Sequence, residues 1–229
     1  MVVSNRLVLL PAAFAVHAAS LVASGLEVLV DCTSDAGEVP PGAWVRVCGV
    51  EGAPGVGPIV VQGGGPHPSR PTWLEQTTAG AAPEGFAGVF LRGLGSGGRA
   101  GERDVRELIA EMPAGVPVLA DWPHPPEVPL PKGVGIVVSD VLLAYLPLGP
   151  ELRARLGRLA AGDFRRAGGQ NFVASLASPA WRRVSAGEAV ERVAMGVYAA
   201  DDPFSAAWPV GSGVLHAEGV SRRFATISE

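Results

Sequence analysis

Lysine is nearly absent from this chain of 229 residues, in which Lys132 is the only one. The 22 acidic residues outnumber the 18 lysines and arginines, and the formal net charge is -4. A surface that binds DNA or RNA needs a dense field of basic side chains against the phosphates. The composition therefore argues against a nucleic-acid-binding protein.

Cysteine is also scarce, since Cys32 and Cys48 are the only two. They have no CxxC spacing, and each falls in an apolar segment. Two such residues cannot form a disulfide framework, so we expect buried free thiols and a cytoplasmic protein. The four histidines have no metal-ligand spacing, and the sequence predicts no metal site.

Long apolar runs are missing as well. No segment reaches the roughly 18 uninterrupted apolar residues of a membrane-spanning helix, so we expect no membrane association. The apolar start of the chain contains Pro11 and His17 and has no charged n-region, which argues against a signal peptide.

The chain is instead rich in short apolar runs that end at glycine, proline or polar turns. Seven of these runs lack the polar alternation of half-exposed strands, which is typical of strands covered on both faces. They are residues 6–12, 26–33, 43–49, 57–65, 85–93, 116–122 and 133–140. Helical spacing occurs over 14–25 and 102–112, and we interpret 71–81 as a short helix.

This order of elements predicts an α/β protein with a parallel β/α barrel of the TIM type, an open doubly wound sheet being the alternative. The links after the second and third strands have only about ten residues each, too few for a crossover helix. We therefore expect a shortened or incomplete barrel whose apolar strand faces need cover from elsewhere. The barrel core is assigned to 1–145 and a helical C-terminal part to 146–229, packed together as one domain.

The glycine-rich segment GLGSGGRAG, residues 93–101, follows a predicted strand. In parallel α/β folds small molecules bind at the carboxyl ends of the strands, where bare backbone can approach an anion or a flat ring. Alternatively, the glycines only turn the chain and Arg99 pairs with Glu102. The candidate ligand-binding residues are Gln62, Gly63, Gly64, Gly97, Gly98, Arg99 and Asp121.

A resemblance adds to this interpretation. The segment GFAGVFLRGLGSGGRAGERDVRELIAEMPAGVPVLAD, residues 85–121, resembles the nitronate monooxygenase family of FMN-dependent barrels, in which a strand leads through a glycine-rich loop and a helix to the next strand. Its GSGGRAGE stretch is more similar to the degenerate form of that family at the N-terminus of some polyketide and polyunsaturated-fatty-acid-type synthases. The resemblance covers residues 6–143 and implies a TIM-type barrel that is part of a multidomain synthase.

The departures from the family bear on its chemistry. Arg99 stands where the family has its catalytic histidine, and a guanidinium that keeps its proton cannot be a general base. The sequence DWPHPP, residues 121–126, replaces the family's glycine-rich phosphate loop, and prolines donate no N–H to a phosphate. We therefore assign no catalytic residue and expect no cofactor, with FMN as the alternative. Asp121 and Asp140, at strand ends, are acid/base candidates or else helix caps.

An arginine-rich segment over 150–169 is predicted to be helical. Such a face would steer an acidic partner such as an acyl carrier protein, or it is a solvated helix without a partner. The docking candidates are Arg153, Arg155 and Arg158.

Two functional hypotheses follow from the resemblance and its departures. In the first, the chain is a degenerate nitronate-monooxygenase-like barrel domain of a polyketide or fatty-acid-type synthase. That domain serves assembly or acyl-carrier docking, with other synthase domains, a carrier protein or a second copy as partners. In the alternative, it is an FMN-dependent, enoyl-reductase-like oxidoreductase that acts on carrier-bound acyl chains. Whether the chain is an enzyme stays open between the two.

Overall fold

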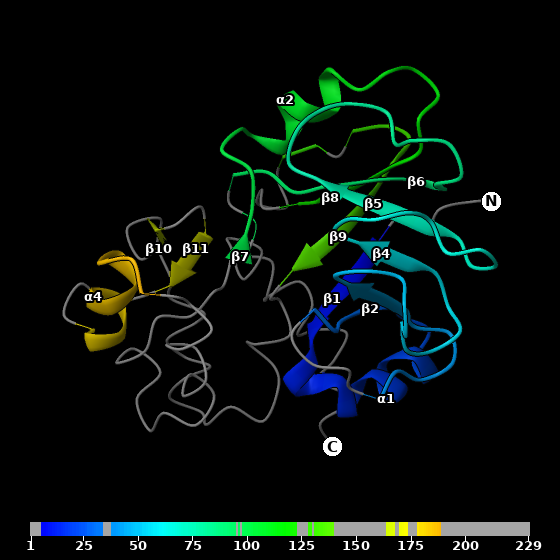
Figure 1. Cartoon of the computed structure of the whole chain (residues 1–229), viewed down its shortest axis with the longest axis horizontal. Helices are drawn as coiled ribbons and strands as arrows, with labels where there is room; N and C mark the ends of the chain where they lie inside the picture. Colours follow the sequence, from blue (N-terminus) through cyan, green and yellow to red (C-terminus); the bar gives the residue numbers. More distant parts are fainter. Residues whose placement is uncertain are drawn as a thin grey trace.

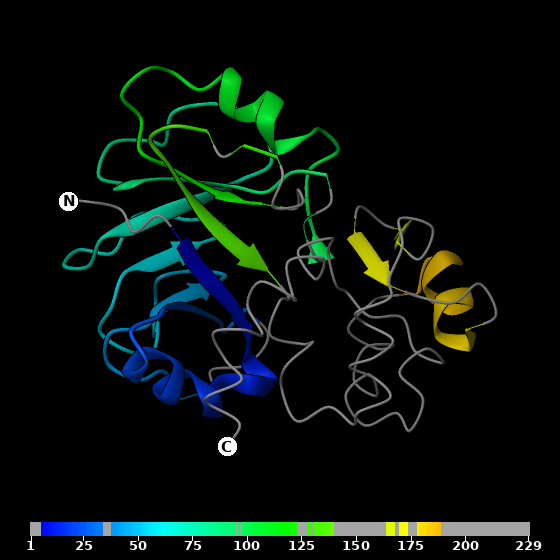
Figure 2. The same cartoon turned by 180° about the vertical axis from the view of Figure 1, so that it is seen from behind.

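A computed structural model of the chain describes residues 6–33, 38–94, 96, 98–122, 128–129, 131–139, 164–167, 170–173 and 178–188. Eight parallel strands form a closed barrel, in which β9 pairs with β1 and so completes the ring (Figures 1 and 2). The strands are β1 (Arg6–Pro11), β2 (Glu27–Asp31), β3 (Trp44–Val47), β4 (Ile59–Val61), β5 (Thr72–Gln76), β6 (Gly88–Leu91), β8 (Val118–Asp121) and β9 (Val134–Ser139). The predicted parallel barrel is confirmed, and the open sheet is excluded.

Strand β5 is the one that the sequence pattern did not predict. The expectation of a short helix over 71–81 is wrong, because Thr72–Gln76 pairs in parallel with β4 on one side and β6 on the other. Thr72 and Trp73 have the branched and aromatic side chains that favour strands, and the two neighbours supply the backbone hydrogen bonds. The seven predicted strands are all present, and β5 is the eighth.

Helices cover only part of the barrel. The 3-10 helix η1 (Ala12–His17) and α1 (Ala18–Ala23) follow β1, and α2 (Val105–Ala110) follows β6, close to the two predicted helices. Within the described residues, the four links between β2 and β6 contain no helix. The predicted shortage of outer helices is therefore confirmed, although the ring of strands is complete. None of the described helices has the length and hydropathy of a membrane span.

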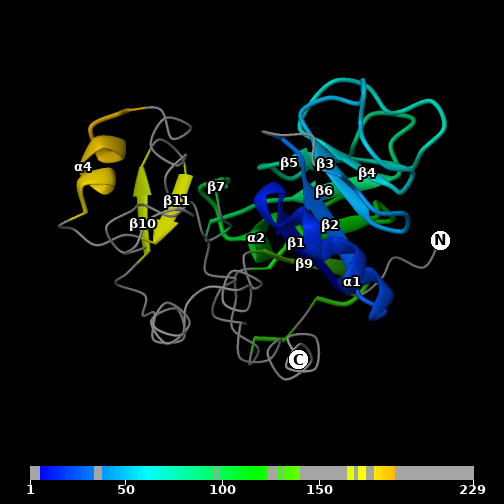
Figure 3. The same cartoon turned by 90° about the horizontal axis from the view of Figure 1, so that it is seen from below.

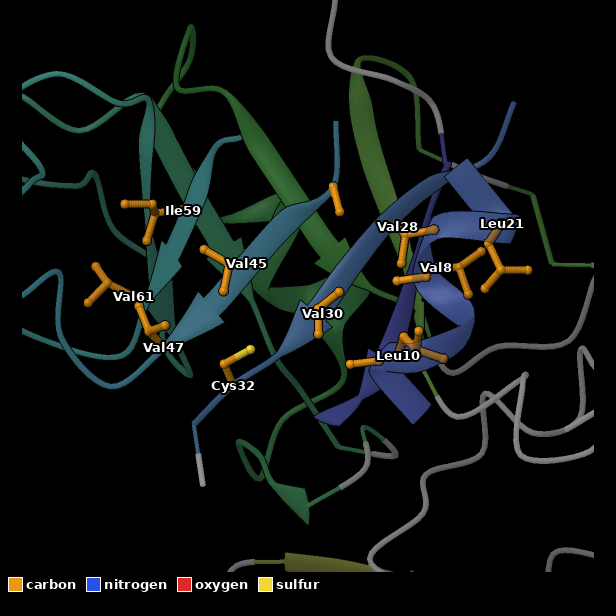
Figure 4. Packing of buried hydrophobic residues seen from close by; sticks show 13 residues of the cluster. Val8, Leu10, Leu21, Val28, Val30, Cys32, Val45, Val47, Ile59 and Val61 are labelled. Atoms are coloured by element: carbon orange, nitrogen blue, oxygen red, sulfur yellow. The ribbon is translucent and has the colours of Figure 1, made fainter. Parts of the chain in front are cut away.

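The links themselves cover the strand faces that have no helix. The outward side chains of β3 and β4 are buried (Figure 4): Val45, Val47, Ile59 and Val61. Apolar side chains of the links pack against this same cluster: Val39, Val50, Ala53 and Phe86. The expectation that these faces need cover from another domain or a partner is wrong, because short links that carry their own apolar side chains provide it.

The described C-terminal residues form a small unit beside the barrel (Figures 1 and 3). Strands β10 (Phe164–Ala167) and β11 (Gln170–Val173) are antiparallel, and β11 also pairs with β7 (Gly98–Arg99) of the glycine-rich segment. Helix α4 (Pro179–Ser185) packs on them through the ring of Trp181, whose centroid lies 5.9 Å from that of Phe172.

This C-terminal unit differs from the helical part that we expected over 146–229. Residues 164–167 of the arginine-rich segment are a strand, so the helix prediction is wrong there, because the pairing with β11 determines their conformation. Residues 140–163 and 189–229 lie outside the described part of the chain.

The lumen of the barrel is packed with apolar side chains from every barrel strand. They are Leu7, Leu9, Leu29, Trp44, Val60, Trp73, Phe90, Leu119 and Val137. Because successive residues of a strand point to opposite faces, these positions identify which residues of each strand point inward. The lower lumen is filled by two indoles, with the ring centroids of Trp44 and Trp73 6.0 Å apart.

Gly88 is required by the way Trp73 fills the lumen, so Gly88→Ala is expected to destabilise the barrel strongly. The added Cβ would lie 2.4 Å from Cζ3 of Trp73 and 2.5 Å from the carbonyl oxygen of Pro117. Overpacking of this kind typically costs about 2 kcal/mol. The free energy of unfolding in urea measures the effect. Gly49→Ala is the control, because no heavy atom lies within 4 Å of its Cβ. Equal unfolding midpoints for both variants would contradict the packing described here.

Candidate functional site

A layer of polar side chains lies just beyond the apolar lumen, at the carboxyl ends of the strands. In six strands the residue two positions after a lumen residue is charged or an amide, and alternate residues share a face, so these side chains point into the mouth of the barrel. They are Asp31, Arg46, Gln62, Glu75, Arg92 and Asp121.

Five of these residues form one continuous ion-pair chain across the mouth. Arg46 donates from Nη1 to Oδ2 of Asp31 at 2.7 Å, and from Nε and Nη2 to the two carboxylate oxygens of Glu75 at 2.6 and 2.8 Å. Nη1 of Arg92 lies 3.7 Å from Oε1 of Glu75, and its Nε donates to Oδ2 of Asp121 at 3.1 Å. The chain therefore runs from β2 through β3, β5 and β6 to β8.

The ion-pair chain is buried except at its Asp31 end. The side chains of Arg92 and Asp121 are 3% and 1% exposed, whereas that of Asp31 is 25% exposed. Burial alone would raise the pKa of Asp31, but Arg46 and two hydrogen bonds from Thr33 outweigh it and hold this pKa below its ordinary value. Burial would likewise raise the pKa of Glu75, but the charges of Arg46 and Arg92 outweigh it, and this pKa is also lowered. Both carboxylates are therefore ionised at neutral pH.

The mouth is covered unevenly. Over β2 to β4 the thiol of Cys48 is exposed and lies 3.3 Å from the carbonyl oxygen of Thr33 and 3.5 Å from Oε1 of Gln62. The expectation of two buried thiols thus holds for Cys32 and is wrong for Cys48, because Cys48 lies beyond the end of β3, at the rim. Over β6 and β8 the side chains of Arg92 and Asp121 are buried, whereas Trp122 is buried in the outer cluster with Val105 and Leu108 of α2.

The glycine-rich segment is built into the fold at both of its ends. A Cβ on Gly93 would lie 2.7 Å from the carbonyl oxygen of Arg103, and one on Gly101 would lie 2.9 Å from that of Arg92. Between them, the backbone of Gly98 and Arg99 pairs with β11. At Gly93 and Gly101 the absence of a side chain thus allows close chain packing, which is a structural role.

Of the predicted ligand-binding residues, the structure brings Gln62 and Asp121 to the same mouth. Gln62 lies 3.5 Å from Glu75, and Asp121 pairs with Arg92. Gly63 and Gly64 follow β4 and have no heavy atom within 4 Å of an added Cβ. The Gly98–Arg99 backbone lies in β7, outside the barrel ring. Outside the described residues lie Gly97, Asp140, Arg153, Arg155, Arg158 and the side chain of Arg99.

Four of the five charged residues of the ion-pair chain are not among the residues predicted from the sequence: Asp31, Arg46, Glu75 and Arg92. The signal was present, because each lies in or next to an apolar run, two positions after a lumen residue. Read singly, each looks like an ordinary polar residue at a strand end. Only the closed ring of strands brings these side chains together.

The chemistry that this layer can support follows from how its charges are used. The five charged groups are directed at one another, and three nitrogens of Arg46 donate hydrogen bonds to two carboxylates. Among the described residues, no group of three or more His, Cys, Asp and Glu could hold a metal ion. The geometry is that of a paired electrostatic layer that closes the lumen.

Glu75 is the central acid of the ion-pair chain, and Glu75→Gln is expected to destabilise the protein by about 3 kcal/mol. In Glu75→Gln, Arg46 keeps Asp31 and Arg92 keeps Asp121, but the amide accepts through one oxygen only and turns N–H donors toward two guanidiniums, so buried donors of Arg46 lose their acceptor. Chemical unfolding measures the loss. Glu111→Gln is the matched control, because it breaks an ion pair with Arg103 whose two partners are both exposed, and little change is expected. A loss no greater than that of the control would contradict the role of Glu75.

The lowered pKa values predict an acid-sensitive fold. Asp31 and Glu75 stabilise the folded state fully above their ordinary pKa values of 3.8 and 4.5. Their contribution is lost as the pH falls through the lower folded-state values, so the free energy of unfolding should decrease below about pH 4. Asp31→Asn should make that decrease shallower in urea unfolding at a series of pH values.

Glu27 is the internal control for this pH dependence, because burial raises its pKa. A raised carboxyl pKa favours the folded state at low pH, so Glu27→Gln should make the loss of stability on acidification steeper. A wild-type stability that did not depend on pH in this range would contradict the ionised layer.

Comparison of the chain with protein-family models, with curated proteins and with solved structures gives no match. The fold and the mouth described above therefore carry the functional argument.

Proposed function

We propose that the chain is a nitronate-monooxygenase-like barrel domain of a polyketide or fatty-acid-type synthase that has lost flavin chemistry and serves assembly or acyl-carrier docking. The observation that carries the proposal is the ion-pair chain across the mouth. Its three carboxylates and two guanidiniums pair with one another at positions from which a catalytic barrel directs such groups at a ligand.

The flavin that the resemblance implies does not fit the described residues. FMN carries a phosphate that needs free N–H donors or a cation at the carboxyl ends of the strands. The donors of Arg46 and Arg92 are directed at carboxylates, and the backbone of Gly98 and Arg99 pairs with β11. No catalytic step is therefore assigned to a flavin.

The charge distribution supports docking to an acidic partner. Residues 1–150 contain 8 basic and 14 acidic residues, whereas residues 151–229 contain 10 basic and 8 acidic ones. In the described C-terminal unit, Arg182 and Arg183 are exposed on α4. The C-terminal part is basic and the barrel is acidic. Long-range attraction would therefore orient an acidic carrier protein toward the C-terminal part.

The first test of the proposal is whether the barrel binds flavin. The purified protein is expected to show no visible flavin absorption after incubation with excess FMN and desalting. A retained flavin band would contradict the proposal and would support the FMN-dependent oxidoreductase.

The second test addresses docking directly. Binding of an acidic acyl carrier protein, measured by calorimetry, should weaken as salt is added and should weaken further when Arg153, Arg155 and Arg158 are changed to glutamate. The control variant changes Arg103 and Arg106 to glutamate. These two arginines are exposed on the barrel side and pair with local acids. Docking at the C-terminal part is contradicted if salt and the first set of reversals have no effect, or if both sets weaken binding equally.

A further inference from the structure

Arg166 lies at the seam between the C-terminal unit and the glycine-rich segment. Its side chain is partly buried on β10, and its Nη2 donates to the carbonyl oxygen of Ala100 at 3.1 Å. Its other terminal nitrogen, Nη1, is buried and has no hydrogen-bond partner. One end of the guanidinium is thus fixed in place, while the other has two N–H donors that are removed from water and unused.

This arrangement differs from those of Arg46, which is buried, and Arg70, which is partly buried. Arg46 directs its donors at the carboxylates of Asp31 and Glu75. Arg70 has no carboxylate, but it spends Nε, Nη1 and Nη2 on three backbone carbonyls: those of Gly57, Ala53 and Pro54.

Arg166 has neither a carboxylate partner nor a full set of carbonyl acceptors. Its one hydrogen bond goes to a neutral carbonyl, and no described carboxylate pairs with it. Buried donors of folded proteins almost always have a partner, and a buried cation without one is strongly disfavoured.

The backbone around Arg166 at the seam is held in place by strand pairing and hydrogen bonds. Residues Gly98 and Arg99 pair with Asn171 and Gln170 of β11. Ala100 and Gly101 are buried, and the N–H of Gly101 donates to the carbonyl oxygen of Arg92 at 3.0 Å. The carbonyl that holds Arg166 therefore belongs to backbone that is anchored to the barrel itself.

We infer that this seam binds a small oxyanion, a carboxylate or a phosphate group, which displaces the groups that shield Nη1 of Arg166 from water and accepts its hydrogen bonds. Such a ligand satisfies the unused donors and neutralises the guanidinium through a charge-assisted hydrogen bond. Because Arg166 belongs to the C-terminal unit and Ala100 to the barrel side, binding also strengthens the attachment of one to the other. The inference goes beyond the docking proposal and does not depend on it.

Titration of the full chain with sodium phosphate at constant ionic strength, held with chloride, tests the inference. Binding measured by calorimetry should be saturable in the wild type, and Arg166→Gln should weaken it about tenfold or more, as expected for the loss of a charge-assisted bond. A parallel titration with sodium acetate separates the two ligand classes, because the class that the site prefers binds more tightly and its loss in Arg166→Gln is larger.

Arg165→Gln is the matched control, because it removes the same charge from the adjacent residue, whose side chain points to the opposite face of β10. It is expected to keep wild-type affinity. If Arg166→Gln fails to fold, Arg166→Lys keeps the charge and removes the second nitrogen, and weaker binding is again expected. The inference is overturned if neither anion binds the wild type saturably, or if binding is equally strong, or equally weakened, in the Arg165 and Arg166 variants.

Discussion

The pairing of Arg46 with Asp31 and Glu75 is the interaction on which the mouth of this barrel depends. An arginine inside a ring of strands is tolerable only if its charge is neutralised and its donors are bonded. Three donor nitrogens of Arg46 meet two carboxylates at 2.6 to 2.8 Å, and Glu75 also lies next to Arg92. The chain then ends at Asp121. Removing an inner member would take a charged partner away from two neighbours that are themselves paired within the same chain.

That constraint also shapes what the barrel can bind. In an enzyme of this architecture the carboxyl ends of the strands supply charges to a substrate or cofactor. Here the same positions supply charges to each other, and the backbone of Gly98 and Arg99 pairs with β11. The unused donors described above lie elsewhere, on Arg166 at the seam with the C-terminal unit. The inferred oxyanion site therefore lies outside the lumen, at the contact between the two parts of the chain.

The links between the strands explain why this barrel needs few outer helices. Between β2 and β6 the chain passes from one parallel strand to the next without a described helix, yet the outward faces of β3 and β4 are buried. Val39, Val50 and Phe86 of the links pack on those faces. A few apolar side chains on short loops thereby replace the helical outer layer, because the strands are only three to five residues long and expose little outer surface.

Local sequence determined the covered parallel strands, the helical segments near residues 14–25 and 102–112 and the shortage of other helices, because unbroken apolar runs and link lengths are properties of short segments. It did not determine β5 or β10, since Thr72–Gln76 and Phe164–Ala167 are strands because they pair with neighbouring strands. The ion-pair chain could not be predicted from local sequence either. Asp31, Arg46, Glu75, Arg92 and Asp121 are spread over about ninety residues, and each alone is only a polar residue after an apolar run. Closure of the ring decided that they meet, because only then do the inward faces of five strands converge on one buried space.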